Sequence, residues 1–402
     1  MSLAEARARD AVDPLRGFRR RFQLPDGVIY LDGNSLGALP VTTPHRVADA
    51  VASQWGDGLI RSWNSAGWID APQRVGARIA PLIGAGADEI IVADSTSVGL
   101  AKLLGAALAA RPERRVILSE PGNFPTDLYV AQGLGAELRL VERDRIAEAL
   151  DDSVAVLMLT HVHYKSAAVH NMKALTAAAH AVGALAIWDL SHSVGAIPVD
   201  LNAANADLAV GCGYKYLNGG PGAPAFLYVA RRHQAVLHNP LPGWMGHAAP
   251  FDFVDDYAPA DGMTRWLTGT PPILGLAALE AGVEIVAEAG MAAIDAKRRL
   301  LTQYLIDCAA EHCPDLELAT PADPDARGSH VSFRHSHAWP LNAALIARGV
   351  IGDFRAPDIL RLGITPLYLG FEDVWRAVAH IADLLATRGW DRPEFHARTA
   401  VT

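Results

Sequence analysis

Short apolar runs alternate with longer Ala/Leu-rich stretches along most of this sequence. The apolar runs are strand-sized and lie at 89–94, 115–120, 154–160, 184–190, 207–212 and 225–230. Helix-like stretches, such as those at 98–110 and 172–183, lie between them. Strands that are apolar along their whole length are typical of sheets buried on both faces. The pattern therefore predicts an α/β fold with a large, mostly parallel sheet covered by helices on both sides.

The alternation ends at a Pro/Gly/Trp-rich stretch, 238–263, which is long for a structureless connection, and such loops are often functional. Two helix-like stretches and two strand-like runs follow it, at 271–290, 295–313, 330–335 and 358–365. We therefore expect a large cofactor-binding α/β domain and a smaller α+β domain. The expected parts are an N-terminal segment that packs with the small domain (1–44), the large domain (45–260), and a linking helix with the small domain (261–402).

Composition narrows the range of partners. The 402 residues include 35 Lys and Arg against 44 Asp and Glu, a formal net charge of −9. An acidic chain is not drawn to nucleic acid or to anionic lipid, so we expect neither as a partner. The N-terminus is charged throughout, without an apolar signal region, and the apolar runs are too short to cross a bilayer. Three cysteines cannot form a disulfide framework, and we expect a cytoplasmic protein.

Lys215 stands in a glycine-rich segment directly after the apolar run at 207–212. Glycine lets a ligand approach the backbone closely, although most lysines beside such turns are simply exposed. Asp189 lies near the end of the run at 184–190, and the carboxyl ends of parallel strands line one crevice. A lysine that condenses with an aldehyde, opposite a carboxylate that pairs with a pyridine nitrogen, suits pyridoxal 5'-phosphate (PLP). Taken alone, Asp189 could equally cap a helix.

Ser95, Thr96 and Ser97 stand between the run at 89–94 and the helix-like stretch at 98–110. Free N–H groups at the start of a helix bind phosphate, assisted by the helix dipole. An ordinary helix N-cap would look the same in sequence. Together with Lys215 and Asp189, however, these residues complete a set of contacts to the phosphate, the ring nitrogen and the aldehyde of PLP.

Six segments, in chain order from about residue 28 to 375, resemble kynureninases. They are YLDGNSLG (30–37), NFPTD (123–127), WDLSHSVGA (188–196), GYKYLNGGPG (213–222), GWMGH (243–247) and GTPPI (269–273). The resemblance implies the aspartate-aminotransferase-type fold (PLP fold type I) and a homodimer. It also implies hydrolysis of L-kynurenine, or of its 3-hydroxy form, to anthranilate or 3-hydroxyanthranilate and L-alanine, in tryptophan degradation. Which of these substrates is preferred stays open.

The resemblance also assigns roles to individual residues. Lys215 would hold the cofactor and move protons, Asp189 would pair with the ring nitrogen, and Tyr214 would donate a proton. The remaining cofactor contacts would come from Thr96, Ser97, Phe124, Asp127, Ser166, His192, Trp244 and Thr270. Among these, Phe124 would stack on the ring, while Thr96 and Ser97 would bind the phosphate.

Arg361 would bind the substrate's α-carboxylate, because a planar guanidinium group matches a carboxylate with two parallel hydrogen bonds. Without the resemblance, a strand-surface arginine is equally compatible with the sequence. Trp63 and Asn64 would form part of an aromatic substrate pocket, although tryptophans here could also belong to the core.

Other readings of the sequence remain. His161 and His163 are spaced on one strand face, but no further ligand at metal spacing accompanies them, and we expect no metal site. A cysteine desulfurase or a class-V aminotransferase would share the cofactor residues and differ in the substrate pocket. A non-catalytic protein that kept the fold is a further alternative, against which the intact Lys215 argues.

Overall fold

A seven-stranded mixed sheet organises the larger part of the molecule, in a computed structural model that describes residues 1–398. Its strands, in spatial order, are β4 (Ile90–Val92), β10 (Phe226–Val229), β9 (Leu208–Gly211), β8 (Leu185–Asp189), β7 (Val154–Thr160), β5 (Val116–Ser119) and β6 (Glu137–Leu140). The pairs from β9 to β6 are parallel, whereas β10 runs antiparallel to both of its neighbours. The predicted mostly parallel α/β sheet is confirmed, with β10 as the exception.

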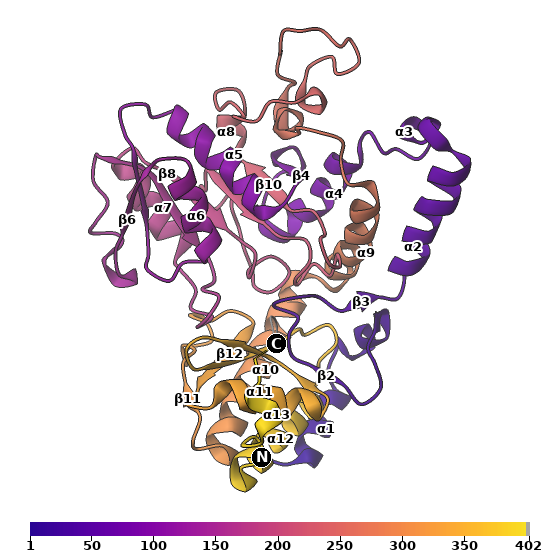
Figure 1. The fold of residues 1–402 in the computed structure, drawn as a ribbon, viewed down its shortest axis with the longest axis vertical. Helices are drawn as coiled ribbons and strands as arrows, with labels where there is room; N and C mark the ends of the chain where they lie inside the picture. The colour runs from indigo at the N-terminus through magenta and orange to yellow at the C-terminus, as the bar shows by residue number, and fades with distance from the viewer. Residues whose placement is uncertain (399–402) are drawn as a thin grey trace.

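Helices cover both faces of this sheet (Figure 1). They include α4 (Ala71–Ile79), α5 (Thr96–Ala109), α6 (Pro125–Gly133), α7 (Met172–Ala181) and α8 (Arg231–Gln234). Alternate residues of each strand enter two separate apolar clusters, one containing Leu103 of α5 and the other containing Val75 of α4 and Ala179 of α7. This double burial explains why the strands are apolar along their whole length.

The smaller part of the molecule is built on a four-stranded antiparallel sheet. Its strands are β11 (Glu317–Leu318), β12 (His330–Arg334), β15 (Ile359–Gly363) and β14 (Asp353–Arg355). Its helices are α11 (Ala338–Ala347), α12 (Phe371–Thr387) and α13 (Pro393–His396). Two long helices, α9 (Ile273–Ala289) and α10 (Met291–His312), lead into it from the large sheet (Figure 1).

The N-terminal residues reach both parts of the molecule. The helix α1 (Leu3–Ala11) packs on α12, and β2 (Ile29–Tyr30) pairs in parallel with β13 (Val350–Ile351). Next, β3 (Leu39–Pro40) pairs with β1 (Phe22–Gln23). A projecting arm follows, made of α2 (Thr43–Asp49), a π-helical segment (Ala50–Asp57) and α3 (Ser62–Ser65). Within residues 1–398, no helix has the length and apolar character needed to span a membrane.

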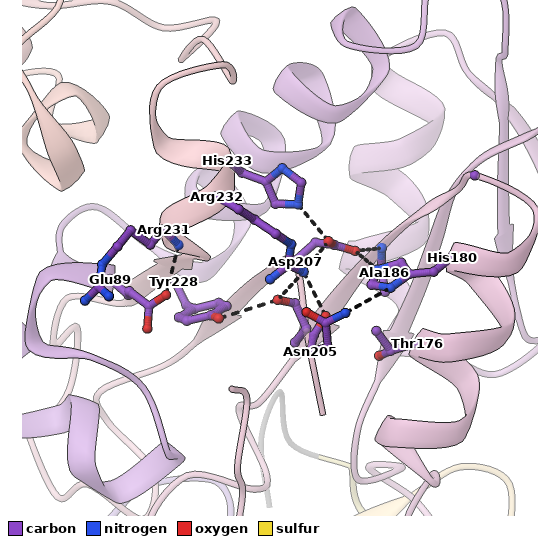
Figure 2. Close-up of polar contacts among 12 residues, drawn as sticks. Glu89, Thr176, His180, Ala186, Asn205, Asp207, Tyr228, Arg231, Arg232 and His233 are labelled. Atoms are coloured by element: carbon purple, nitrogen blue, oxygen red, sulfur yellow. Dashed lines mark hydrogen bonds and ion pairs between the residues drawn. The ribbon is translucent and has the colours of Figure 1, made fainter. Parts of the chain in front are cut away.

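A polar cluster around the buried carboxylate of Asp207 lies at the amino ends of the central strands (Figure 2). Asp207, directly before β9, accepts hydrogen bonds from His180, Arg232 and His233, at 2.6–2.7 Å. The N–H of Ala186, at the start of β8, donates to the same carboxylate at 2.8 Å. We call this set of residues the Asp207 cluster. Its hydrogen bonds join β8 and β9 to α7 and α8 at the end of the sheet opposite to Asp189.

Candidate active site

A cavity opens at the carboxyl ends of the parallel strands and contains most of the predicted cofactor residues. Asp189 ends β8, Lys215 follows β9, and the two strands are paired in parallel. The cavity is lined by Thr96, Ser97, Phe124, Thr126, Asp127, Thr160, Tyr164, Asp189, Ser191, His192, Tyr214 and Lys215. The sheet topology thus brings together segments that lie far apart in the sequence.

A second cavity, of about 650 Å³, shares Thr96 and Tyr214 with the first and also contains Thr270. It extends toward the glycine- and proline-rich turn at 221–224. The structure therefore places Thr270 next to the phosphate-binding segment that the sequence predicts.

The remaining predicted residues lie outside these two cavities. Ser166 contacts the Nδ1 atom of His163 through its hydroxyl at 3.0 Å, and Trp244 stacks on Phe253 at the edge of a separate surface cavity. Trp63 and Asn64 lie in α3, on the projecting arm. Arg361 is buried in β15, and its Nη1 atom donates to the backbone carbonyl of Tyr164, a residue of the cavity wall.

Asp189 is a buried carboxylate in the cavity wall with few hydrogen-bond partners. Its Oδ1 atom accepts the N–H of Ser191 at 2.8 Å, in the tight turn after β8. Burial raises the pKa of Asp189 above its ordinary value, although the side chain of Ser191, the nearby charge of Lys215 and the N–H of Ser191 oppose the shift. A cationic ligand beside this carboxylate would therefore stabilise its ionised form, which burial disfavours.

Lys215 lies in the wall of the same cavity, with its amine 5.8 Å from the ring centroids of both Phe124 and Tyr214. Burial lowers the pKa of Lys215, which increases the uncharged fraction that can act as a nucleophile or base. Gly37 packs directly beneath it, since its N–H donates to the carbonyl of Tyr214 at 2.8 Å. A Cβ on Gly37 would lie 2.3 Å from the carbonyl oxygen of Lys215, so this close approach requires glycine.

Asp127 and Thr160 form a polar wall that sequence reasoning described only in part. Asp127 accepts hydrogen bonds from the amide of Asn123 at 3.0 Å and from the hydroxyl of Thr160 at 3.2 Å. Burial, followed by the charge of Asp189, raises the pKa of Asp127 well above its ordinary value. Sequence analysis missed Thr160, although its position at the end of the apolar run at 154–160 was a signal for it.

His192 presents an unpartnered polar atom in the cavity wall. Its ring is buried, and Nδ1 has no hydrogen-bond partner among residues 1–398. Burial lowers the pKa of His192 well below its ordinary value, so the imidazole is neutral near pH 7. A buried atom of this kind calls for a ligand to satisfy it.

The opposite end of the cavity is formed by the start of α5. Ser95 is the N-cap and accepts the N–H of Val98 at 3.4 Å, so Thr96 and Ser97 occupy the first turn. The first N–H groups of a helix have no intrahelical partner and favour an anion. The cavity thus combines an anion site, the flat ring of Phe124, a buried carboxylate and an amine. This donor set fits PLP.

The histidines that suggested a metal pair have other partners. His161 contacts the hydroxyl of Ser193 at 2.9 Å, and His163 contacts the carbonyl of Gly122 at 2.9 Å. Over the described residues, no group of three or more His, Cys, Asp or Glu side chains is arranged to hold a metal ion.

Comparison with known proteins decides the family. The chain is 50% identical over 411 aligned residues to a kynureninase of Burkholderia mallei, covering 99% of both chains, and 49% identical to one of Pseudomonas fluorescens, covering 98% of both. The chain belongs to the kynureninase family. A model of the kynureninase C-terminal domain also matches residues 294–381. Kynureninases act with PLP, in agreement with the donor set of the cavity.

Solved structures share the fold of this kynureninase-family chain, PLP fold type I. A cysteine desulfurase from Thermococcus onnurineus matches with a TM-score of 0.80 at 21% identity, over 92% of this chain and 98% of that chain. A C-DES variant with glycine covalently linked to its PLP cofactor matches with a TM-score of 0.78 at 16% identity, over 91% and 99%. At these identities the likeness concerns the fold. The predicted fold class is confirmed.

Proposed function

We propose that this chain hydrolyses L-kynurenine to anthranilate and L-alanine, with PLP held in the cavity around Lys215. The observation that carries the proposal is the convergence of Lys215, Asp189, Phe124 and the start of α5 on one cavity in a chain of this family. When bound, PLP supplies an aldehyde that condenses with amines and a ring that withdraws electrons from the substrate's α-carbon.

The cavity residues hold the cofactor from several sides. Thr96 and Ser97 bind the phosphate at the first turn of α5, joined by Tyr214 and Thr270 from the adjoining cavity. Phe124 would stack on the ring of bound PLP, and Asp189 would pair with its ring nitrogen. Polar contacts to the ring substituents come from Asp127 and His192, and further contacts from Trp244 and Ser166.

Proton transfers fall to Lys215 and Tyr214. Because burial lowers its pKa, the Lys215 amine is suited to take the proton from the substrate's α-carbon and to return it later. Burial raises the pKa of Tyr214, so its hydroxyl keeps its proton near neutral pH and can protonate the β-carbon when the Cβ–Cγ bond breaks. Water attacks the γ-carbonyl before that cleavage. Arg361 recognises the substrate's carboxylate, and Trp63 with Asn64 contacts its aromatic ring.

A homodimer is part of the proposal. Two segments project from the molecule, the arm and the loop at 238–263 (Figure 1). They carry exposed apolar side chains: Trp55 and Ile60 on the arm, and Phe253 and Val254 on the loop. Ile60 is 77% exposed and Phe253 is 75% exposed, and exposed apolar side chains that are grouped in this way are often covered by another chain. A partner would also bring Trp244 and Trp63 toward a cofactor site. A wild-type protein that sediments as a monomer at micromolar concentration would contradict this.

We also propose the three-part division at residues 44 and 260, and a cytoplasmic location. The second rests on Cys212, Cys308 and Cys313, which are buried free thiols, as a reducing compartment allows.

The test is to mix the purified protein with PLP and L-kynurenine and to follow anthranilate by its fluorescence. Lys215→Ala should abolish turnover, whereas Lys173→Ala, at an exposed position on α7, should leave it unchanged. The same assay with 3-hydroxy-L-kynurenine decides the preferred substrate. If neither compound is cleaved by the PLP-loaded wild type, the proposed function is wrong.

A further inference from the structure

Arg361 is already engaged on most of its hydrogen-bonding edge. Its Nε atom donates to Oδ1 of Asp353 at 2.7 Å, and its Nη2 atom pairs with Oδ2 of the same carboxylate. Nη2 also donates to the hydroxyl of Ser35 at 3.0 Å, and Nη1 donates to the carbonyl of Tyr164 at 2.6 Å. One of the two guanidinium edges that can bind a carboxylate with two parallel hydrogen bonds, the Nε/Nη2 edge, is therefore occupied by Asp353.

Arg355 belongs to the same ion cluster and is less enclosed. Its Nη2 atom lies 2.7 Å from Oδ2 of Asp353 and 3.4 Å from the hydroxyl of Ser35. Its side chain is 34% exposed, against 2% for Arg361. Its Nη1 atom contacts the carbonyl of its neighbour Phe354, and Nε has no hydrogen-bond partner among the described residues, so N–H groups of Arg355 remain for a ligand.

The charges of this cluster balance only when Asp32 is ionised. Burial would raise the pKa of Asp353, but Arg361 and Arg355 hold it below its ordinary value, so Asp353 is ionised. Asp32 is the nearby carboxyl group, and its Oδ1 atom is buried without a partner among the described residues. Burial and the charge of Asp353 raise the pKa of Asp32 to about 7. Below that pH, two guanidinium groups face one ionised carboxylate, and a second anion completes the cluster.

The cluster also adjoins the cavity. Tyr164, which lines the cavity, accepts a hydrogen bond from Arg361, and Lys165 donates to the carbonyl of Ala356, next to Arg355. Burial lowers the pKa of Lys215, and the charges of Arg361 and Arg355 add to this effect. The positive charge of Arg355 therefore lies close enough to lower the pKa of the Lys215 amine, which the substrate must approach.

We propose that Arg355 is a second substrate-binding arginine, which shares the α-carboxylate of the substrate with the Nη1 side of Arg361 while Asp353 remains on the other edge of Arg361. This inference rests on the proposed function and deepens it, because it moves the main carboxylate contact to the more exposed arginine. It gives Asp353 the task of holding the two guanidinium groups side by side.

The experiment compares Arg355→Gln, Arg355→Lys and Arg361→Gln with the wild type, all loaded with PLP. Two competitive inhibitors serve as probes: 4-(2-aminophenyl)-4-oxobutanoate, which keeps the carboxylate, and the corresponding carboxamide. Arg355→Gln should raise the KM for L-kynurenine and the inhibition constant of the acid on the order of 10- to 100-fold, with kcat changed by less than about threefold. The inhibition constant of the amide should change by less than about threefold.

Arg355→Lys keeps the charge but not the planar donor edge, so it should recover part of the preference for the acid. The matched control is Arg334→Gln, because Arg334 lies in the same sheet, is half exposed and pairs weakly with Glu317 and Asp358 at 4.0 and 3.6 Å. It should leave both inhibition constants unchanged. Thermal unfolding of each variant identifies any folding defect. If Arg355→Gln does not fold, the preference of Arg355→Lys for the acid over the amide decides the role of Arg355.

The experiment distinguishes a failure of the proposed function from a failure of the proposed role of Arg355. A wild type that releases no anthranilate would reject the proposed function. A wild type that is active, with an Arg355→Gln variant that keeps the full preference for the acid over the amide, would reject the role of Arg355. In that second case, loss of the preference in Arg361→Gln would assign the carboxylate to Arg361 alone.

Discussion

Asp189 and Asp207 are buried carboxylates at opposite ends of neighbouring strands, and their surroundings differ sharply. Asp207 accepts hydrogen bonds from His180, Arg232, His233 and the N–H of Ala186 (Figure 2). Asp189 accepts one from the N–H of Ser191. Both are at most 5% exposed, so burial alone does not distinguish them.

The pKa values follow the hydrogen bonds. Burial would raise the pKa of Asp207, but the bonds from His233, Ala186 and His180 outweigh it and lower the value to about 2. Burial raises the pKa of Asp189, where the opposing contacts are fewer. A carboxylate whose partners are all supplied by the protein holds the fold together. One that is buried with few partners is instead suited to a cationic ligand.

The largest expected effect concerns activity at Asp189. Asp189→Asn should lower kcat by about a thousandfold, equivalent to about 4 kcal/mol, because the ring nitrogen loses its anionic partner. The free energy of unfolding, measured with urea, should stay within about 1 kcal/mol of the wild type or rise, because an under-paired buried charge is removed. If the free energy of unfolding fell by as much as the free energy equivalent of the loss in kcat, Asp189 would not differ from Asp207 in the way proposed.

The converse is expected at Asp207. Asp207→Asn should lower the free energy of unfolding by about 3 kcal/mol, because Arg232, His180 and His233 lose their shared acceptor. Urea unfolding measures this change. The kcat of the folded variant should remain within about twofold of the wild type, since the cluster lies at the far end of the sheet. A collapse of kcat in fully folded protein would show that the cluster serves the reaction.

Acid should remove the contribution of Asp207. Its pKa in the folded state, about 2, lies below the ordinary 3.8, so its stabilisation is present above about pH 4 and is lost as the pH falls toward 2. The difference in unfolding free energy between wild type and Asp207→Asn should therefore shrink by about 2 kcal/mol between about pH 6 and about pH 2. A difference in unfolding free energy that does not change with pH would mean that the ionised carboxylate of Asp207 does not stabilise the folded state.

The smallest effect concerns Asp32, a third buried carboxyl group, beside Arg355 and Arg361. Because its pKa is raised to about 7, it is uncharged below that pH and ionises above it, which adds a negative charge near the substrate's carboxylate. The KM for L-kynurenine should rise about fivefold, or ~1 kcal/mol, between about pH 6 and about pH 8. Asp32→Asn should flatten this dependence; an unchanged pH profile in the variant would assign the rise to another group.

Much of the large domain was predictable because its strands are buried on both faces. The apolar runs at 89–94, 154–160 and 184–190 became β4, β7 and β8 with small shifts of their ends. The edge strand β6 was missed, because its Glu137–Leu140 residues are half exposed and carry no apolar run. The parallel pairing of β2 with β13 joins residues about 320 positions apart, which no local pattern indicates.

The site was predictable only in part, for a similar reason. Lys215, Asp189 and the start of α5 stand at strand ends, where topology alone brings them together. The cluster of Arg361, Arg355 and Asp353 depends on how the small domain meets the loop at Tyr164, which sequence spacing does not reveal. Family resemblance pointed to Arg361 without its counter-ion, and it did not point to Thr160, which lines the cavity.

The central claim is that Lys215 is the lysine that binds PLP. The other lysines are Lys102, Lys165, Lys173 and Lys297. Lys102 and Lys297 are buried in ion pairs with Asp94 and Asp13, at 2.6 and 2.7 Å. Reduction of the PLP-loaded protein with borohydride, followed by digestion and mass spectrometry of the peptides, should place the pyridoxyl group on Lys215. A pyridoxyl group found on any other lysine, with Lys215 unmodified, would contradict the account.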